Sequence, residues 1–542
     1  MDGAVSQGPG DAPRGWRWRP GDRLLAGPLM VFVLLRVPSF LEPHWYTDEA
    51  GYVTTARSLL QGKVLYTQVW NNKPPIHLWT VALGISVLGD SEAALHVMTF
   101  LSGLVTLAAI AYGGKRLLGR RRTLIALLIT AALLGSPLFD AELLLPECLL
   151  IAPVTWAGVL LLIRVNNADS RRWPLWPAGV GVLAGLAFGY QQTALAETCA
   201  FGLILALVAP SGASRARRLA VYAAAVVSLT ALWLVPALLT AGASAVAYAL
   251  VGFYLAFTQS RYAQSEAATA LELLLPVAIL ALIVVSAWLR RREHDLTLGF
   301  WVWAAAALLV PTVARQPYAH YLVPSIAPGV MALSSLGLGW RRRRESRRAP
   351  AAPRLLGRRA PRLAGVGVVA GAVLALAGGT GAGTDWWPIR APGNHSMVTY
   401  YGGAISVMSR QSSLSAYQDP FDYRVPEDAE VGAWISANGL DGSSAVVWSS
   451  DAWLYETNDL QLVLPTAPIY NDNVLLGSDL APMVAALTPD LIVTEGHARS
   501  AWPSINGVLS ADYQEMDHSD DGNEIVWVRD DLVASLPRSP AS

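Results

Sequence analysis

The chain has 542 residues, of which 53% are hydrophobic, and its mean hydropathy is +0.38. These values exclude a soluble globular protein, because many apolar runs approach the roughly 20 residues that a helix needs to cross a bilayer. The formal net charge of zero hides a division: from Asp385 onward the chain carries 22 acidic and 6 basic residues, whereas the preceding part carries 18 acidic and 34 basic residues. The sequence therefore predicts two domains in different surroundings.

Arginine clusters between the apolar runs set the predicted topology. If every cluster faces the cytoplasm, as the positive-inside rule requires, successive spans cross the membrane in alternating directions without conflict. The N-terminus is then inside and the acidic C-terminal part outside. The first run lacks a small-residue cleavage site and is expected to be a retained anchor. Eleven spans are predicted, near residues 24–41, 92–113, 123–138, 147–163, 177–190, 196–210, 219–240, 272–289, 298–313, 321–340 and 363–383. The fifth and sixth are short enough to form a bent or re-entrant pair.

The composition then divides the chain into five parts. We expect a cytoplasmic tail at 1–23, a transmembrane catalytic domain at 24–340, a basic cytoplasmic linker at 341–362, a last transmembrane helix at 363–383 and a soluble extracytoplasmic domain at 384–542. The linker suits anionic headgroups, which makes nucleic-acid binding a poor interpretation. The two cysteines, Cys148 and Cys199, both lie in apolar runs and imply no disulfide framework.

The soluble domain is predicted to be a small α/β unit. Strand patterns alternate with helix patterns, which favours a Rossmann-like sheet, and no glycine-rich phosphate loop follows the first strand, so a nucleotide site is not supported. Helices are expected at 427–438, 452–457 and 480–487, and strands at 445–449, 489–495 and 524–529.

Adjacent carboxylates, Asp48 and Glu49, open the first outer loop, which spans residues 42–91. An acid pair beside the bilayer is costly unless it is paired or used, so one carboxylate could act as a general base. The alternative is a helix cap, in which Thr47 or Asp48 begins a helix running through Leu60. In such a helix, Tyr52 would lie one turn from Asp48 and extend a polar stripe beside the base.

Lys73 stands before two prolines in the same loop, in a chain with only three lysines among 40 basic residues. Its ammonium could bind phosphate as a compact charge, and the prolines would stiffen the backbone that carries it. A snorkelling lysine at the membrane interface is the competing interpretation.

Two further outer segments carry polar groups. Asp140, Glu142 and Glu147 lie in or beside a short turn, where interfacial solvation, orientation of an acceptor or a hard divalent cation such as Mg²⁺ could explain them; no histidine or cysteine accompanies them at zinc-site spacing. The segment ARQPYAHYLVP contains three more candidates, namely Arg315, His320 and Tyr321. The arginine could hold a lipid phosphate in bidentate fashion, and an interfacial aromatic belt could explain the other two.

These residues resemble a known family. The pattern D-E-x-x-Y, then A-R-x-L-x-x-G, then a lysine before Pro-Pro and a tryptophan is similar to the first outer loop of GT-C membrane glycosyltransferases, in particular the family 39 type, which includes protein O-mannosyltransferases and the lipid A aminoarabinose transferase. The matching residues here are Asp48, Glu49, Tyr52, Ala56, Arg57, Leu59, Gly62, Lys73, Pro74, Pro75 and Trp79. The acidic turn at Glu142 and the HYLVP segment at His320 are supporting matches.

The resemblance implies an inverting transfer of a sugar from a polyprenyl-phosphate donor to a hydroxyl of an extracytoplasmic glycan, lipid or protein. It also implies Asp48 as base and Lys73 near the leaving phosphate. Taken with the patterns above, we expect Glu49 beside the base, and substrate contacts from Tyr52, Arg57, Lys73, Glu142, Arg315, His320 and Tyr321. There are departures from the pattern. Some relatives carry an arginine where this chain has Gly51, and some carry a metal-holding glutamate where this chain has Asn72. No cofactor is therefore assigned, although a divalent cation would suit the chemistry.

We expect the protein to lie in the cell membrane, in particular a bacterial plasma membrane. Two other functions compete with that of a transferase. A transporter or flippase for a lipid-linked envelope precursor would place ionisable residues deep in its spans and show inverted repeats. The sequence instead concentrates charges at the outer ends of the spans and shows no clear internal repeat. A non-enzymatic envelope scaffold would use the soluble domain as a receptor.

Overall fold

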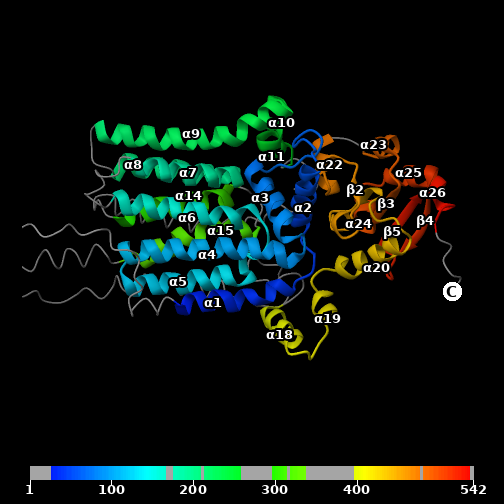
Figure 1. Cartoon of the computed structure of the whole chain (residues 1–542), viewed down its shortest axis with the longest axis horizontal. Coiled ribbons are helices and arrows are strands. Elements are labelled where there is room, and N and C mark those ends of the chain that lie inside the picture. The colour runs from blue at the N-terminus through cyan, green and yellow to red at the C-terminus, as the bar shows by residue number, and fades with distance from the viewer. Residues whose placement is uncertain are drawn as a thin grey trace, which may run out of the picture.

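The computed structural model describes residues 26–165, 175–208, 213–257, 296–313, 318–336, 396–476 and 480–536. Its larger part is a bundle of roughly parallel and antiparallel helices, and its smaller part is an α/β domain that stands on one end of the bundle (Figure 1). The predicted fold class, an α-helical membrane protein with a C-terminal α/β domain, is confirmed. The predicted spans at 272–289 and 363–383 and the linker at 341–362 lie outside the described residues.

The bundle helices follow the apolar runs of the sequence. Three of them, α4, α6 and α9, are long and apolar enough to cross a membrane. Helix α6 is packed on most sides, whereas α9 lies at the edge and leaves most of its surface exposed. The bundle comprises α1 (Ala26–Arg36) with the 3₁₀ turn η2 (Val37–Leu41), α4 (Glu92–Leu117), α5 (Arg120–Gly135), α6 (Pro146–Val165), α7 (Trp176–Tyr190), α8 (Leu195–Val208), α9 (Ala213–Ala241), α14 (Leu296–Val313) and α15 (Val323–Ser334).

Close packing in the bundle depends on small residues. A side chain at Gly158 of α6 would collide with the ring of Trp303 of α14, and one at Gly181 of α7 would meet the backbone of Tyr222 in α9. Small residues let helices approach closely where lipid supplies no hydrophobic driving force. The glycines therefore fix which helices can be neighbours.

The first outer loop contains two helices rather than one. Helix α2 (Thr47–Leu60) matches the predicted helix, but α3 (Pro75–Leu88) is an apolar helix that the sequence interpretation left inside the loop. Its exposed Leu83 and Val87 extend the apolar surface of the bundle. A second correction concerns the predicted outer loop 241–271, which begins with an apolar helical segment made of α10 (Ala243–Ala247), a π-helical turn (Tyr248–Gly252) and α11 (Phe253–Phe257).

The C-terminal domain holds a five-stranded mixed sheet in the order β2-β1-β3-β5-β4. Strands β1 and β3 are parallel, with Ala445 opposite Leu491, and β3 pairs antiparallel with β5, with Leu491 opposite Val528. All three predicted strands and all three predicted helices of this domain are present. The strands are β1 (Ser444–Trp448), β2 (Gln461–Leu462), β3 (Leu491–Glu495), β4 (Tyr513–His518) and β5 (Glu524–Arg529).

Helices cover the sheet and connect it to the bundle. The connection is made by α18 and α19, which lie beside the end of the bundle, and by α22, which packs on α11 (Figure 1). The helices of this part are α18 (Met397–Met408), α19 (Leu414–Gln418), α20 (Arg424–Ala437), α21 (Leu454–Thr457), α22 (Ile469–Leu476), α23 (Ala481–Leu487), α24 (Gly496–Ala501), α25 (Ile505–Asp512) and α26 (Asp530–Val533).

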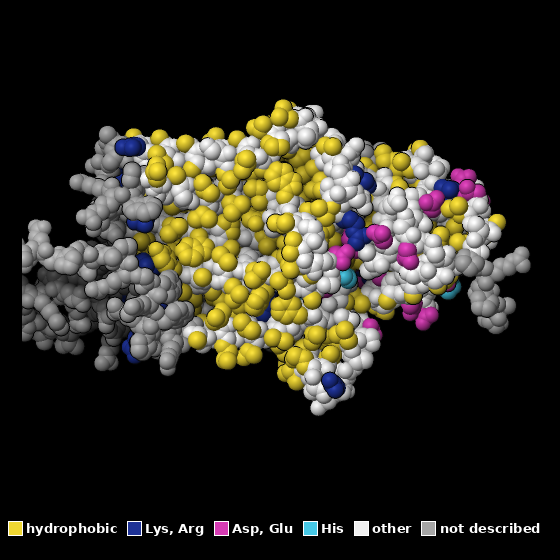
Figure 2. All heavy atoms as spheres, in the orientation of Figure 1, with side chains coloured by type: hydrophobic (Ala, Val, Ile, Leu, Met, Phe, Trp, Pro, Cys, Tyr) yellow, Lys and Arg dark blue, Asp and Glu magenta, His cyan; other side chains and the backbone are white. Residues whose placement is uncertain are grey.

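The surface follows the same division. Figure 2 shows apolar side chains over the bundle, acidic side chains over the C-terminal domain, and arginine and lysine at the end of the bundle that lies away from that domain. The charge asymmetry of the sequence thus corresponds to two opposite ends of the described molecule.

Candidate active site

Helix α2 presents Asp48 at the junction of the two domains. The residue before the helix, Tyr46, has an extended backbone and provides no side-chain cap, so neither Thr47 nor Asp48 caps the helix and the predicted cap is wrong. The Asp48 carboxylate instead accepts hydrogen bonds from the hydroxyls of Tyr52, at 3.5 Å, and Tyr470, at 3.3 Å. Asp48 is half-buried in the first turn of α2, where its carboxylate belongs to a polar cluster and does not cap the helix.

Lys73 is held beside α2 by the side chain of Asn71. The amide of Asn71 donates to Thr55 at 3.3 Å and accepts from the backbone N–H of Lys73 at 3.1 Å. The Lys73 ammonium then lies 5.8 Å from the centre of the Tyr52 ring, within cation–π range. The predicted polar stripe through Tyr52 therefore brings the base and the lysine to one tyrosine, the base at its hydroxyl and the lysine near its ring.

Electrostatics also connect Lys73 to the base. Burial acts to lower the pKa of Lys73, but Tyr254, which is hydrogen-bonded to it, together with Glu147 and Asp48, outweighs burial and raises the pKa. The ammonium therefore stays charged although its side chain is buried. A permanent cation within electrostatic reach of two carboxylates is a suitable place for the charge of a phosphate.

His320 and Tyr321 form a further wall of the cluster. The predicted residue His320 lies in the 3₁₀ turn η8 (Ala319–Leu322), and its Nδ1 is 3.2 Å from the carboxylate of Asp140. Burial acts to lower the pKa of His320, but its hydrogen bond to the Asp140 carboxylate and the charge of Glu147 raise it. Two segments far apart in the sequence, the acidic turn and the HYLVP segment, therefore meet as an acid–imidazole pair.

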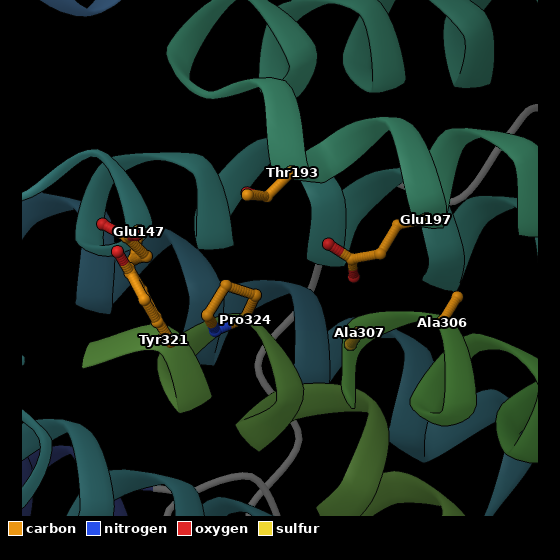
Figure 3. A pocket seen from close by; sticks show the side chains of 7 residues that line it. All are labelled: Glu147, Thr193, Glu197, Ala306, Ala307, Tyr321 and Pro324. Atoms are coloured by element: carbon orange, nitrogen blue, oxygen red, sulfur yellow. The ribbon is translucent and has the colours of Figure 1, made fainter. Parts of the chain in front are cut away.

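A pocket opens beside this wall, between α6, α8, α14 and α15 (Figure 3). In Figure 3, Glu147 and Tyr321 lie close together on one side and Glu197 on the other. Glu147 accepts a hydrogen bond from Gln191 at 2.6 Å, and Glu197 accepts one from Trp303 at 2.8 Å. Apolar groups complete the lining, from Ala306, Ala307 and Pro324.

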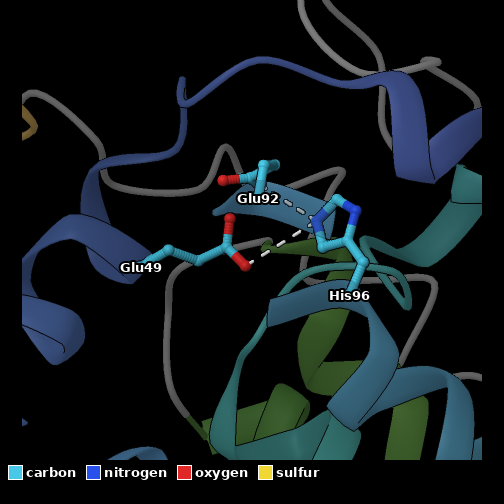
Figure 4. Close-up of side chains that lie close together, drawn as sticks. All are labelled: Glu49, Glu92 and His96. Atoms are coloured by element: carbon cyan, nitrogen blue, oxygen red, sulfur yellow. Dashed lines mark ion pairs between the residues drawn. The ribbon is translucent and has the colours of Figure 1, made fainter. Parts of the chain in front are cut away.

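Glu49, the predicted partner of Asp48, turns away from this cluster. It is fully buried and accepts a hydrogen bond from the backbone N–H of Leu144. Figure 4 shows its carboxylate pointing at His96, 3.9 Å away, which also pairs with Glu92 at 3.0 Å. Burial and the charge of Glu92 raise the pKa of Glu49 well above its usual range.

The three side chains in Figure 4 could hold a metal ion. One donor atom from each of Glu49, Glu92 and His96 lies within 4.8 Å of the others. Two carboxylates and an imidazole suit a divalent cation. The sequence interpretation looked for a cation among the acids of the 140–147 turn and missed this group, since its members come from α2 and α4. A signal existed in the Glu92–His96 spacing of one helical turn.

Glu142 and Arg57 are engaged elsewhere. The carboxylate of Glu142 lies 3.8 Å from the guanidinium of Arg36 inside the bundle. Arg57 pairs through three nitrogens with Asp90 at 2.8 Å, Glu456 at 2.9 Å and Asp459 at 2.7 Å. These contacts account for Arg57 as a connection between α2 and the C-terminal domain. Arg315 lies outside the described residues.

Three further members of the cluster were not predicted as site residues, namely Glu147, Tyr254 and Tyr470. Glu147 was recognised only as one of several acids. Tyr254 lies in α11, which the sequence interpretation treated as loop, and Tyr470 comes from the other domain. No local pattern marks either tyrosine, because their partners in the cluster are distant in sequence.

Part of the sequence is similar to known proteins. Residues 72–239 match the family model of dolichyl-phosphate-mannose-protein mannosyltransferases. An uncharacterized protein of Aquifex aeolicus (strain VF5) is 27% identical over 167 residues, which are 27% of this chain and 33% of that protein, so the chain matches about a third of the relative's length.

The fold is similar to that of ArnT from Cupriavidus metallidurans. The crystal structure of ArnT bound to undecaprenyl phosphate matches with a TM-score of 0.57 and 14% identity, covering 93% of this chain and 97% of that chain. Its apo crystal structure matches with a TM-score of 0.54 and 15% identity, covering 93% and 98%. The family match is confined to residues 72–239, whereas the similarity of fold extends over most of the chain.

Proposed function

We propose that this protein transfers a sugar from a polyprenyl-phosphate donor to a hydroxyl group of an extracytoplasmic acceptor, with inversion at the anomeric carbon. The observation that carries the proposal is the convergence of Asp48 and Lys73 on Tyr52, one through a hydrogen bond of 3.5 Å and the other 5.8 Å from the ring centre. A proton acceptor and a phosphate-binding cation are the two groups that this reaction requires.

Asp48 acts as the general base in this mechanism. The acceptor oxygen attacks the anomeric carbon, its proton passes to the Asp48 carboxylate, and the bond between the anomeric carbon and the phosphate oxygen breaks with its electrons leaving on the polyprenyl phosphate. Little acid catalysis is needed, because a phosphodiester-linked sugar already has a good leaving group. Asp48 suits the role because it is half-buried and not used as a helix cap.

Lys73 stabilises the charge that develops on the leaving phosphate. Its charged state is maintained by Tyr254, Glu147 and Asp48, and its backbone is fixed by Asn71 and by the hydroxyl of Tyr66, which donates to the Lys73 carbonyl at 2.8 Å. A preorganised cation stabilises a transition state without reorganising during the reaction. A cation bound by Glu49, Glu92 and His96 would add positive charge nearby, and no step above depends on one.

The donor enters from the membrane and the acceptor from the outer aqueous side. Lipid-facing α3 begins two residues after Lys73, so an isoprenoid tail can lie along apolar surface while its phosphate meets the ammonium. We place the protein in the cell membrane as a multi-pass chain with its C-terminal domain outside, because basic side chains gather at the opposite end of the bundle (Figure 2). The domain boundaries predicted above stay part of this proposal.

The test uses the purified full chain in proteoliposomes with a panel of undecaprenyl-phosphate sugars and native envelope fractions as acceptor. Release of undecaprenyl phosphate is measured. Asp48→Asn should lower the rate by at least about 100-fold, in the range typical of a lost general base. Asp419→Asn, an exposed aspartate of the C-terminal domain, is the matched control. Full transfer by Asp48→Asn would exclude it as the base.

A second variant in the same assay tests the phosphate contact. Lys73→Ala should reduce kcat/KM for the donor by about 10- to 100-fold, the effect of losing one charged hydrogen bond. Lys63→Ala changes the same residue type in the same loop, where the ammonium binds the Leu462 carbonyl at 3.1 Å, and should leave donor kinetics intact. If both variants have the same kcat/KM for the donor, Lys73 does not contribute to the donor site.

A further inference from the structure

The C-terminal domain reaches the proposed base through residues 464–472, which we call the 464–472 segment. Within the domain, the N–H of Ile469 donates to the carbonyl of Ser449 just after β1, at 3.1 Å, and the N–H of Thr466 donates to the buried Asp472 at 3.2 Å. Toward the bundle, the carbonyl of Pro465 accepts from the N–H of Trp70 at 2.8 Å. Hydrogen bonds thus attach the segment both to its own domain, beside the sheet, and to the first outer loop.

Gly51 makes room for this segment on α2. A Cβ at Gly51 would lie 3.3 Å from Pro468, a contact tighter than most real Cβ contacts. Some members of the family that the sequence resembles carry an arginine at the place of Gly51. In this chain, the space that such a side chain would need is occupied by Pro468, one turn of helix from the base.

Tyr470 is the residue that the segment delivers to Asp48. Its hydroxyl is 3.3 Å from Asp48 Oδ1, while the hydroxyl of Tyr52 is 3.5 Å from Oδ2, so each carboxylate oxygen has its own tyrosine. The Tyr470 ring is buried and lies 6.4 Å from the ring of Phe257 on α11. An aromatic contact and burial hold the hydroxyl in place.

We propose that Tyr470 is a positioning residue for Asp48 and that the 464–472 segment forms the acceptor-side wall of the active site. This inference rests on the proposed function. Two hydroxyl donors, one on each oxygen, fix the orientation of the carboxylate. Because one donor comes from each domain, the soluble domain is part of the catalytic arrangement.

The experiment compares Tyr470→Phe with Tyr423→Phe in the full chain in proteoliposomes. Tyr423 lies in the same domain, and its hydroxyl also donates to a carboxylate, that of Glu495, at 2.5 Å. The kcat and the KM for the donor are measured from the release of undecaprenyl phosphate, and binding of undecaprenyl phosphate itself by native mass spectrometry. Tyr470→Phe should lower kcat about 10-fold and leave both the KM for the donor and lipid binding unchanged. Tyr423→Phe should change none of these.

A second variant acts from the opposite side of the contact. Gly51→Ala adds a Cβ against Pro468 and should lower kcat without weakening the binding of undecaprenyl phosphate. If Tyr470→Phe does not fold, the kcat of Gly51→Ala still tests whether the contact of the segment with α2 supports catalysis.

The two proposals fail separately. If Asp48→Asn is inactive but Tyr470→Phe keeps the wild-type kcat, Tyr470 does not position the base and the proposed function stands. If Asp48→Asn is fully active, the proposed function fails first. A Tyr470→Phe variant with fewer folded molecules but an unchanged kcat per folded molecule would reveal a purely structural role and overturn this inference.

Discussion

Several buried carboxylates lie close together at the end of the bundle. Glu42, Glu49 and Glu142 are all buried, and Arg36 is the arginine nearest to Glu142, at 3.8 Å. Burial is the main reason that the pKa of Glu42 is raised to about 7 and that of Glu142 to about 8. Near neutral pH such groups hold protons that they would lose in water, which lets acidic residues pack together without matching cations.

Glu142 gives this arrangement a measurable pH dependence. Burial first, then Glu42 and Asp140, raises its pKa from 4.5 to about 8, against the opposing effect of Arg36. Between these two pH values the folded protein retains a proton that the unfolded chain has lost, so the stability contributed by this group is full below about pH 4.5 and falls as pH rises to 8. Glu142→Gln cannot ionise and avoids this loss.

The melting temperature of Glu142→Gln relative to the wild type should therefore rise between pH 5 and pH 8. The free energy of unfolding of the variant, relative to that of the wild type, should increase by a few kcal/mol over this range, on the order of what about 1.4 kcal/mol per unit of pKa shift implies. Melting curves in detergent at both pH values measure it, with the exposed Glu515→Gln as control. A difference that stays constant with pH would contradict the assignment of a buried, protonated carboxyl.

Helix α2 is the element that joins the two domains. Its first turn carries Asp48 and its last turn carries Arg57, whose guanidinium contacts Glu456 and Asp459 of the C-terminal domain and Asp90 before α4. The carboxylate of Glu456 is almost completely buried. Removing the arginine would leave that charge buried and unpaired, which costs more than an exposed ion pair.

Arg57→Ala should destabilise the protein by about 1–3 kcal/mol and speed proteolysis at the junction of the domains. Arg410→Ala, which removes an exposed arginine of the C-terminal part, should have little effect. Adding Glu456→Gln to Arg57→Ala should recover part of the loss, because the leftover charge is then gone. No recovery in the double variant would show that the ion pair is not the source of the destabilisation.

The sequence predicted elements well where one face or the whole surface is apolar. The helix at 47–60 and the strands β1, β3 and β5 were identified because their patterns are local. Helix α3 was missed because its 14 residues are too few to span a membrane. Strand β4 was missed because only its first side chain is buried, so its burial shows no alternation. Asp48 and Lys73 could be predicted from one loop, whereas the contacts of Tyr254 and Tyr470 depend on packing that no short pattern records.

At the scale of the whole molecule, the two charged ends predict the orientation in the membrane. Arg120 lies exposed at the start of α5, and Ser412 lies exposed between α18 and α19 on the side of the C-terminal domain. In a Cys199→Ala background, Ser412→Cys should react with a membrane-impermeant maleimide on intact cells. Arg120→Cys should react only after the cells are permeabilised. Labelling of Arg120→Cys on intact cells would reverse the topology.

The hydrogen bond between Tyr470 and Asp48 has a consequence for how the protein is made. During translation the ribosome produces the whole described bundle before residue 470 emerges, so the nascent membrane part exists for a time with only Tyr52 beside the Asp48 carboxylate. The second tyrosine arrives only when the C-terminal domain has been made and has docked on the bundle. The surroundings of the carboxylate are therefore completed late, and a chain truncated before this domain would lack one of the two hydroxyl donors to Asp48.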